Sequence, residues 1–166
     1  MQKAGVAKAS LYNLFGSKEE LVQAYLDAGH ADTRVQVERA LTRFRTPRER
    51  LLGVFDGQGQ LFTEPDFNGC AHMTASAEAL RGSPVEGAAD RYRLWVRTLF
   101  TDLAREAEAG VAAPEDLARQ LHLLYDGAGV SARMDRNPSA ATTARMAAAS
   151  LFDATVKDKE LADAGQ

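Results

Sequence analysis

Residues 8–21 read KASLYNLFGSKEEL, a short apolar segment followed by a Gly-Ser break and an acidic helix start. Ser17 followed by Glu20 has the form of a capping box, in which the serine hydroxyl accepts a hydrogen bond from the Glu20 amide. The pattern therefore predicts a helix that begins at Lys18. The apolar residues before the break repeat at helical spacing and predict a shorter helix there.

Helix starts recur along the rest of the chain, whereas strand patterns do not. Several starts have a capping residue, then a proline at the first helical position and an acidic residue in the first turn. Apolar residues repeat at intervals of three and four after each start. The sequence thus predicts an all-α protein, with further helices over about 47–63, 69–81 and 84–109, from Pro114, and after Asn137-Pro138.

Composition narrows the class of protein. A chain of 166 residues with 45% hydrophobic and 26% charged residues is typical of a globular domain. It contains no apolar run of the roughly 20 residues needed to span a bilayer and no signal-peptide pattern, so a cytoplasmic protein without a membrane partner is expected. With Cys70 as the single cysteine and three scattered histidines, no disulfide, metal or cofactor is predicted.

Charge is distributed unevenly within the net value of -3. Residues 1–18 contain Lys3, Lys8 and Lys18 and no acidic residue, so the N-terminal end is cationic. A basic segment in an acidic protein indicates either a nucleic-acid contact or simply a solvated end.

The longer stretch AGVAKASLYNLFGSKEELVQAYL, residues 4–26, combines a Gly-Val turn, a short helix and the capped helix start. This arrangement is typical of a helix-turn-helix element. The stretch resembles the signature of the TetR family of bacterial transcription regulators. The remainder, including GCAHMTASAE (69–78) and LARQLHLLYDGAG (117–129), more weakly resembles the ligand-binding and dimerisation domain of that family.

The resemblance implies a role for the polar residues of this stretch in DNA binding. Tyr12 and Lys18 would contact phosphates, and Lys8, Ser10 and Asn13 would lie at or near the bases. Ala7 departs from the family pattern, which has a capping Ser or Thr there; losing such a cap costs about 1 kcal/mol.

A second departure lies upstream of the turn. The family has a complete first helix and most of a second before the position of Gly5-Val6, where this sequence has Met1 to Ala4. A start codon placed too far downstream, a shortened chain and a natural truncation all explain this difference. Without those helices Leu11, Leu14 and Phe15 lose cover, so the chain as given is expected to bind DNA only weakly and nonspecifically.

A small-molecule pocket is expected among the later helices. Aromatic side chains of the helix over 84–109 face the small-residue helix over 69–81, as in apolar ligand sites, although core packing explains the same residues. An apolar or amphipathic effector is expected to lie near Trp95. The predicted pocket residues are His72, Met73, Tyr92, Trp95, Phe100 and Tyr125. We expect no enzyme, because no converging set of catalytic groups is found: Cys70 and His72 are two residues apart on a helix.

The last two helices are predicted to form a homodimer. A leucine stripe and many small residues allow close helix packing between subunits, and the resemblance implies the same interface. The predicted interface residues are Leu117, Leu121, Leu124, Ala128, Ala148 and Phe152.

Two interpretations follow. The first is a ligand-responsive transcription regulator, a repressor that binds palindromic operator DNA as a homodimer. The second is a dimeric small-molecule-binding module without effective DNA binding. In both, residues 1–44 form a partial helix-turn-helix region with its linking helix, and residues 45–166 form the ligand-binding and dimerisation domain.

Overall fold

The computed structural model describes residues 14–107 and 113–164, with 157–164 described by their backbone alone. Regular structure in these residues is helical throughout, which confirms the predicted all-α fold. None of the helices in this part of the chain is long and apolar enough to cross a membrane. The helices are α2 (Lys18–Leu41), α3 (Pro47–Phe62), α4 (Ala71–Glu78), α5 (Pro84–Glu106), α6 (Pro114–Met134) and α7 (Ala140–Ala164).

Capping residues set the starts of three helices where the sequence predicts them. Thr46 and Glu49 form a complete capping box before α3, because the Thr46 hydroxyl accepts the Glu49 amide while the Glu49 carboxylate accepts the Thr46 amide at 3.0 Å. Before α2 and α5 the serine hydroxyls accept amides in the same way, Ser17 from Glu20 and Ser83 from Glu86. These local bonds explain why the predicted starts are confirmed.

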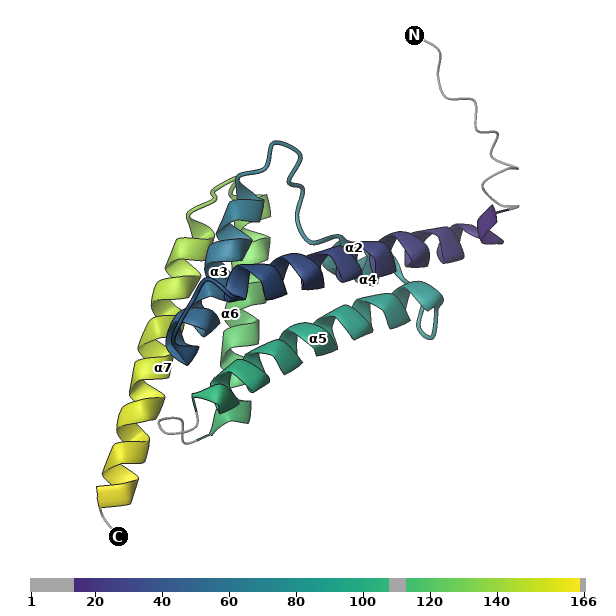
Figure 1. Ribbon diagram of the computed structural model, residues 1–166. Helices are drawn as coiled ribbons and strands as arrows, with labels where there is room; N and C mark the ends of the chain where they lie inside the picture. The colour runs from purple at the N-terminus through teal and green to yellow at the C-terminus, as the bar shows by residue number, and fades with distance from the viewer. Residues whose placement is uncertain (1–13, 108–112, 165–166) are drawn as a thin grey trace.

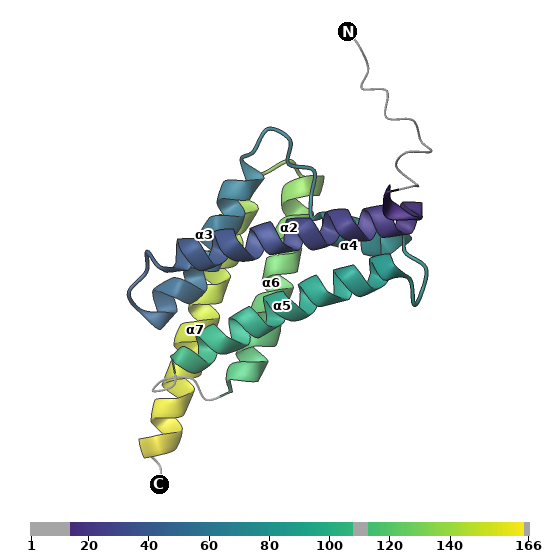
Figure 2. The same cartoon turned by 45° about the vertical axis from the view of Figure 1, so that its right-hand side comes forward.

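The helices lie in two groups. α2 runs beside α5, and the short helix α4 packs against α5 (Figure 1). α3, α6 and α7 pack together across one end of this pair, and the N-terminal end of α2 lies far from α7 in both views (Figure 2). The fold therefore holds the start of α2 away from the main bundle.

The main core lies where α3, α5, α6 and α7 meet. Phe55 of α3 and Phe100 of α5 are fully buried, and their ring centroids lie 5.6 Å apart. Phe100 was predicted to line a pocket; instead it is 0% exposed and packs inside this core. The position of Phe100 on α5 faces α3 and α6, and its part in a ligand pocket stays a prediction.

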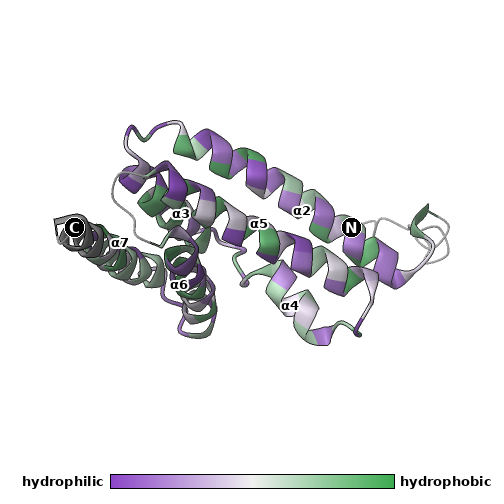
Figure 3. Ribbon diagram, turned by 90° about the horizontal axis from the view of Figure 1, so that it is seen from below, coloured by the Kyte–Doolittle hydropathy of each residue, from purple (hydrophilic) through white to green (hydrophobic). Residues whose placement is uncertain are grey.

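Two residues of α2, Leu26 and Leu41, are buried, and each belongs to a different apolar cluster. Near its end, Leu41 joins the main core; near its start, Leu26 forms a small cluster with Val85 and Ala88 of α5. Elsewhere α2 carries polar residues over much of its surface (Figure 3). The division into residues 1–44 and 45–166 stays a prediction, since α2 packs on both α3 and α5.

The predicted dimer residues mostly face inward. Five of the six are buried within this chain and belong to its own core: Leu117, Leu121, Ala128, Ala148 and Phe152. α6 and α7 use these apolar stripes to pack on each other and on α3 and α5, and a role of the same residues in a subunit contact stays a prediction. Leu124 is half-buried and packs against the same core.

Candidate functional site

The start of α2 carries the one predicted DNA-binding residue that the structure describes. Lys18 is exposed in the first turn of α2, where unpaired backbone amides favour an anion. Leu14 and Phe15, just before the helix, are exposed apolar side chains. The other predicted DNA contacts lie outside the described residues: Lys8, Ser10, Tyr12 and Asn13.

A groove of about 600 Å³ lies between α4 and α6. Its walls are mainly apolar, and its rim carries polar groups, among them Arg133, which donates to the Thr74 hydroxyl at 3.2 Å. This volume is typical of small-molecule sites. The groove is lined by Gly69, Cys70, Met73, Thr74, Ala77, Glu78, Gly129, Val130, Arg133 and Met134.

A buried amide lies close to Gly129 of the groove wall. A Cβ atom at this position would lie 3.8 Å from Nε2 of Gln58, which is not itself among the residues that line the groove. Gln58 is only 7% exposed; its Nε2 donates to the Tyr125 carbonyl oxygen at 2.8 Å, while its Oε1 has no hydrogen-bond partner. A buried acceptor without a partner is uncommon and marks a place for a donor from a ligand or water.

Two tyrosine hydroxyls of this region and the Cys70 thiol are neutral, whereas Glu78 and Arg133 of the groove lining are charged. The hydroxyl oxygens of Tyr92 and Tyr125 lie 3.2 Å apart. Burial raises the pKa of Tyr125 to about 12 and also raises the pKa of Tyr92 and of the Cys70 thiol. At neutral pH these groups are hydrogen-bonding hydroxyls and a thiol, which suits binding of an uncharged group rather than nucleophilic catalysis.

An aromatic cluster lies where α2, α4 and α5 meet. The rings of His72 and Tyr92 are stacked with centroids 4.1 Å apart, and His30 lies 5.6 Å from Tyr92 and 5.3 Å from Trp95. Nε2 of His72 lies 3.1 Å from the carbonyl oxygen of Leu26; because a carbonyl only accepts, this nitrogen carries the proton.

The predicted pocket residues therefore separate into groups. His72, Tyr92 and Trp95 form the aromatic cluster, Met73 lines the groove on the other side of α4, and the Tyr125 hydroxyl meets that of Tyr92 behind the groove. Their role in ligand binding stays a prediction.

Sequence reasoning missed two residues, His30 and Gln58. Each occupies a position of an inward-facing apolar stripe: His30 follows Leu26 by four residues, and Gln58 follows Phe55 by three. A polar residue at such a position is the signal that identifies them.

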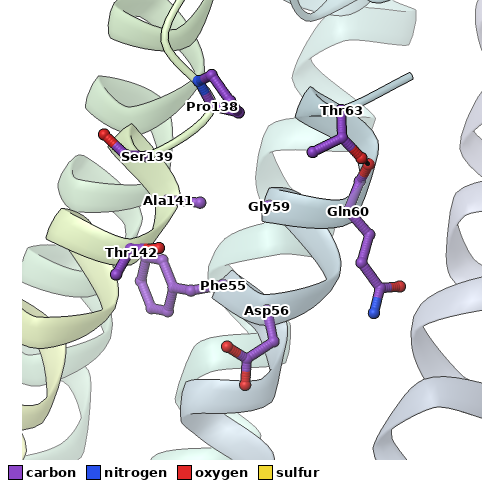
Figure 4. A pocket seen from close by; sticks show the side chains of 9 residues that line it. All are labelled: Phe55, Asp56, Gly59, Gln60, Thr63, Pro138, Ser139, Ala141 and Thr142. Carbon is purple, nitrogen blue, oxygen red and sulfur yellow. Dashed lines mark hydrogen bonds between the residues drawn. The ribbon is translucent and has the colours of Figure 1, made fainter. Parts of the chain in front are cut away.

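A second hollow, of about 480 Å³, lies between α3 and α7 (Figure 4). The two helices approach closely here, since a Cβ at Gly59 would lie 3.2 Å from the Ala141 methyl. Asp56 already pairs with Arg145 at 2.9 Å. We favour the α4–α6 groove as the candidate site, because its walls are more apolar and an unpartnered buried group lies close to its wall.

The outer face of α6 carries exposed apolar residues one and two turns apart. We call Leu123, Gly127, Val130 and Met134 the α6 stripe; Leu123 is 71% exposed and Met134 76%. A groove of about 380 Å³ between α6 and α7 runs along one side of it. A row of this kind is typical of a protein-protein contact.

Comparisons with known proteins agree with this helical arrangement. The sequence model described as "Bacterial regulatory proteins, tetR family" matches residues 1–25. A comparison with curated proteins finds no significant match. Among solved structures, SCO4454, a TetR-family transcriptional regulator from Streptomyces coelicolor, is similar with a TM-score of 0.83 and 26% identity, over 92% of this chain and 80% of that one.

Two further structures are similar. The reduced form of NemR from Escherichia coli has a TM-score of 0.74 at 22% identity, over 87% of this chain and 79% of that one, which supports the fold alone. The TetR-type regulator sav143 from Streptomyces avermitilis has a TM-score of 0.77 and 33% identity, over 92% of this chain and 82% of that one. This identity over most of both chains, together with the match at residues 1–25, shows that the chain belongs to the TetR family of bacterial transcription regulators.

Proposed function

We propose that this protein is a ligand-responsive transcription regulator, a repressor that binds palindromic operator DNA as a homodimer and holds its effector in the α4–α6 groove. The observation that carries the proposal is the position of α4. One side of this helix lines the groove through Met73 and Ala77, and the other side contacts α2 and α5 through His72 and Ala75. A ligand that displaces α4 therefore changes the contacts that hold α2.

Movement of α2 has a direct consequence for DNA binding. The helix begins at Lys18, with Ser17 as its N-cap, directly after the segment that resembles a recognition helix. In a dimer, two such segments must reach two half-sites at a fixed spacing. An effector that binds more tightly when α2 is in a different position lowers operator affinity. The loss of binding free energy cannot exceed the difference in the effector's binding free energy for the two positions.

The lining of the groove favours an apolar or amphipathic effector that donates a hydrogen bond. Met73, Val130 and Met134 supply apolar contact area, and methionines adapt to ligands of different shape. Near Gly129, the buried amide of Gln58 has an Oε1 atom without a hydrogen-bond partner. An uncharged hydroxyl or amine on an aromatic or aliphatic body fits these groups.

The homodimer is proposed to form through the α6 stripe rather than through the buried leucines. Two copies of Leu123, Gly127, Val130 and Met134 can pack against one another across a twofold axis, with the outer face of α7 alongside. Gly127 has open space around its Cα, so it allows the partner's backbone to come close.

DNA binding is tested with the gene product made in its own cell. A tag at the C-terminus leaves the natural translation start unchanged, and chromatin immunoprecipitation is then expected to enrich a small set of palindromic sites. Replacing Lys18 with alanine should lower that enrichment roughly tenfold, because each subunit loses a hydrogen bond from a charged group to phosphate.

The matched control is Arg43→Ala, which removes one exposed cation just beyond the opposite end of α2 and should leave the enrichment unchanged. Absence of any enriched site, with the tagged protein present, would favour the dimeric binding module without DNA binding.

The groove is tested with 8-anilinonaphthalene-1-sulfonate, an amphipathic aromatic probe. We expect saturable binding of one probe per chain. Replacing Ala77 with phenylalanine should fill part of the groove and weaken binding roughly tenfold, which corresponds to about 1.4 kcal/mol of lost contact. Fluorescence titration measures the change.

The same substitution at Ala24, an exposed alanine of α2, serves as the control and should leave the affinity unaltered. If Ala77→Phe and the unmodified protein bind the probe equally, the α4–α6 groove is not the site.

A further inference from the structure

Two histidines lie at the contact between α2 and the helices beneath it. His30 belongs to α2 and His72 to α4, and their ring centroids lie 6.2 Å apart in an edge-to-face arrangement. Both rings also contact Tyr92 of α5. These three helices therefore meet through aromatic rings, two of which change charge near neutral pH.

The two imidazoles differ in their hydrogen bonding: the bond to the Leu26 carbonyl raises the pKa of His72, against the larger effect of burial, whereas His30 lacks an acceptor. His72 is buried and donates from Nε2 to the carbonyl of Leu26, which ties α4 to the backbone of α2 at 3.1 Å. Nε2 of His30 is buried and has no hydrogen-bond partner. A proton added to that nitrogen would place a charged donor among rings without an acceptor.

The charged groups around the pair do not offset a second positive charge. On α2, Asp27 favours protonation of both rings, but its carboxylate already binds Arg91 of α5, at 2.7 and 3.0 Å. Arg34 of α2 and Arg91 of α5 oppose the charging of His30, and His30 opposes the charging of His72. Burial is the largest cause that lowers the pKa of both rings.

We propose that His30 and His72 form a proton-sensitive latch, which holds α2 against α4 and α5 while both rings are neutral and releases it when they are protonated. One imidazolium can still stack on Tyr92 as a cation on an aromatic face. Two imidazoliums 6.2 Å apart repel each other, and separation of α2 from α4 relieves that repulsion.

The direction of the effect follows from proton uptake. Once α2 is released, the pKa of each ring returns toward the ordinary histidine value of 6.5. The released form therefore binds protons more tightly than the form in which α2 packs against α4 and α5. The packing of α2 against α4 and α5 is therefore at its most stable above pH 6.5, and it weakens as the pH falls through and below that value. The latch concerns this chain alone; only its effect on operator binding depends on the proposed function.

Hydrogen exchange measured by mass spectrometry tests the latch on the full chain. After correction for the intrinsic exchange rate, protection of the α2 amides should fall roughly tenfold or more between pH 7.5 and pH 5.5, while that of α3 changes little. In the double variant His30→Gln, His72→Gln, where Gln at position 72 can still donate to Leu26, protection of α2 should not depend on pH.

The third histidine provides a matched control. His122 is also buried and burial also lowers its pKa, but it lies on α6 beside Asp126, 3.6 Å away. The variant His122→Gln should keep the pH response of α2. Constant protection of α2 in the unmodified protein, an unchanged response in the double variant, or a lost response in His122→Gln would each overturn the proposal.

Trp95 gives an independent measurement if the double variant does not fold. Its ring lies 5.3 Å from that of His30, so its emission should change with the same midpoint as α2 protection. In the single variant His30→Gln that change should shrink or disappear. Retention of the full change in His30→Gln would show that the latch does not involve this residue.

Discussion

Replacing Leu123 with arginine is expected to give a folded monomer and to weaken operator binding about a hundredfold. Leu123 is 71% exposed on the α6 stripe, so the substitution leaves the core of the chain unaltered. In the proposed dimer it places two arginines at a twofold contact between apolar side chains. A monomer reaches one half-site at a time and loses the gain from binding two together, which is on the order of a hundredfold or more.

Sedimentation at micromolar concentration measures the first effect. The unmodified protein should sediment at twice the 18.0 kDa of one chain, and Leu123→Arg at the mass of one chain. The control is Leu94→Arg, at a leucine of α5 that is also exposed; it should remain dimeric. An unmodified protein that is a monomer, or a dimeric Leu123→Arg, would contradict the proposed interface.

Replacing Phe100 with alanine should lower the free energy of unfolding by about 3 to 5 kcal/mol. The side chain is fully buried, and its ring contacts those of Phe55, at 5.6 Å, and Tyr125, at 6.0 Å. Truncation leaves a void that helices packed on three sides cannot easily fill. In a chain of this size, the melting temperature should fall by roughly 6 to 20 °C.

Thermal or urea unfolding at one protein concentration measures this loss, since dimerisation also contributes to stability. Leu94→Ala on the exposed side of α5 should change stability by less than about 0.5 kcal/mol. If Phe100→Ala loses less than about 1 kcal/mol while weakening probe binding, then Phe100 lines a ligand cavity, as the sequence first suggested.

The helices could be predicted from the sequence because their starts depend on neighbouring residues. Thr46 and Glu49 hydrogen-bond to each other across one turn, and Pro47 between them has the backbone angle that a helix needs. Such bonds form within four residues, so reading the chain in order is enough to place them. The predicted starts of α2, α3, α5 and α6 therefore match the observed ones.

The partners of each helix face could not be predicted in the same way. An apolar stripe on α6 contains Leu117, Leu121 and Ala128. The pattern alone does not show whether α5 of the same chain or α6 of a second chain covers this stripe. The same ambiguity affected Phe100, whose aromatic ring suits a pocket and a core equally. Resolving it requires contacts between residues far apart in the sequence.

The groove shares the small-residue helix α4 with the predicted pocket, but it lies between α4 and α6, whereas the prediction placed the pocket between α4 and α5, near Trp95. The small residues of α4 indicated a space near this helix, and the groove lies along it. Gln58 was not predicted because it belongs to α3, and its importance depends on Gly129 of α6, which lies 71 residues further along the chain. No pattern within a single helix connects these two residues.

Val130 and Met134 belong both to the α6 stripe and to the wall of the α4–α6 groove. A molecule bound in the groove and a second subunit packed on the stripe would both contact these two side chains. If effector binding favours one position of these side chains, it changes the affinity between subunits. By thermodynamic reciprocity, association of the subunits changes the affinity for the effector by the same factor. The sensitivity of this protein to its effector would then depend on how much of the protein the cell contains, because dilution changes the fraction of chains that are paired.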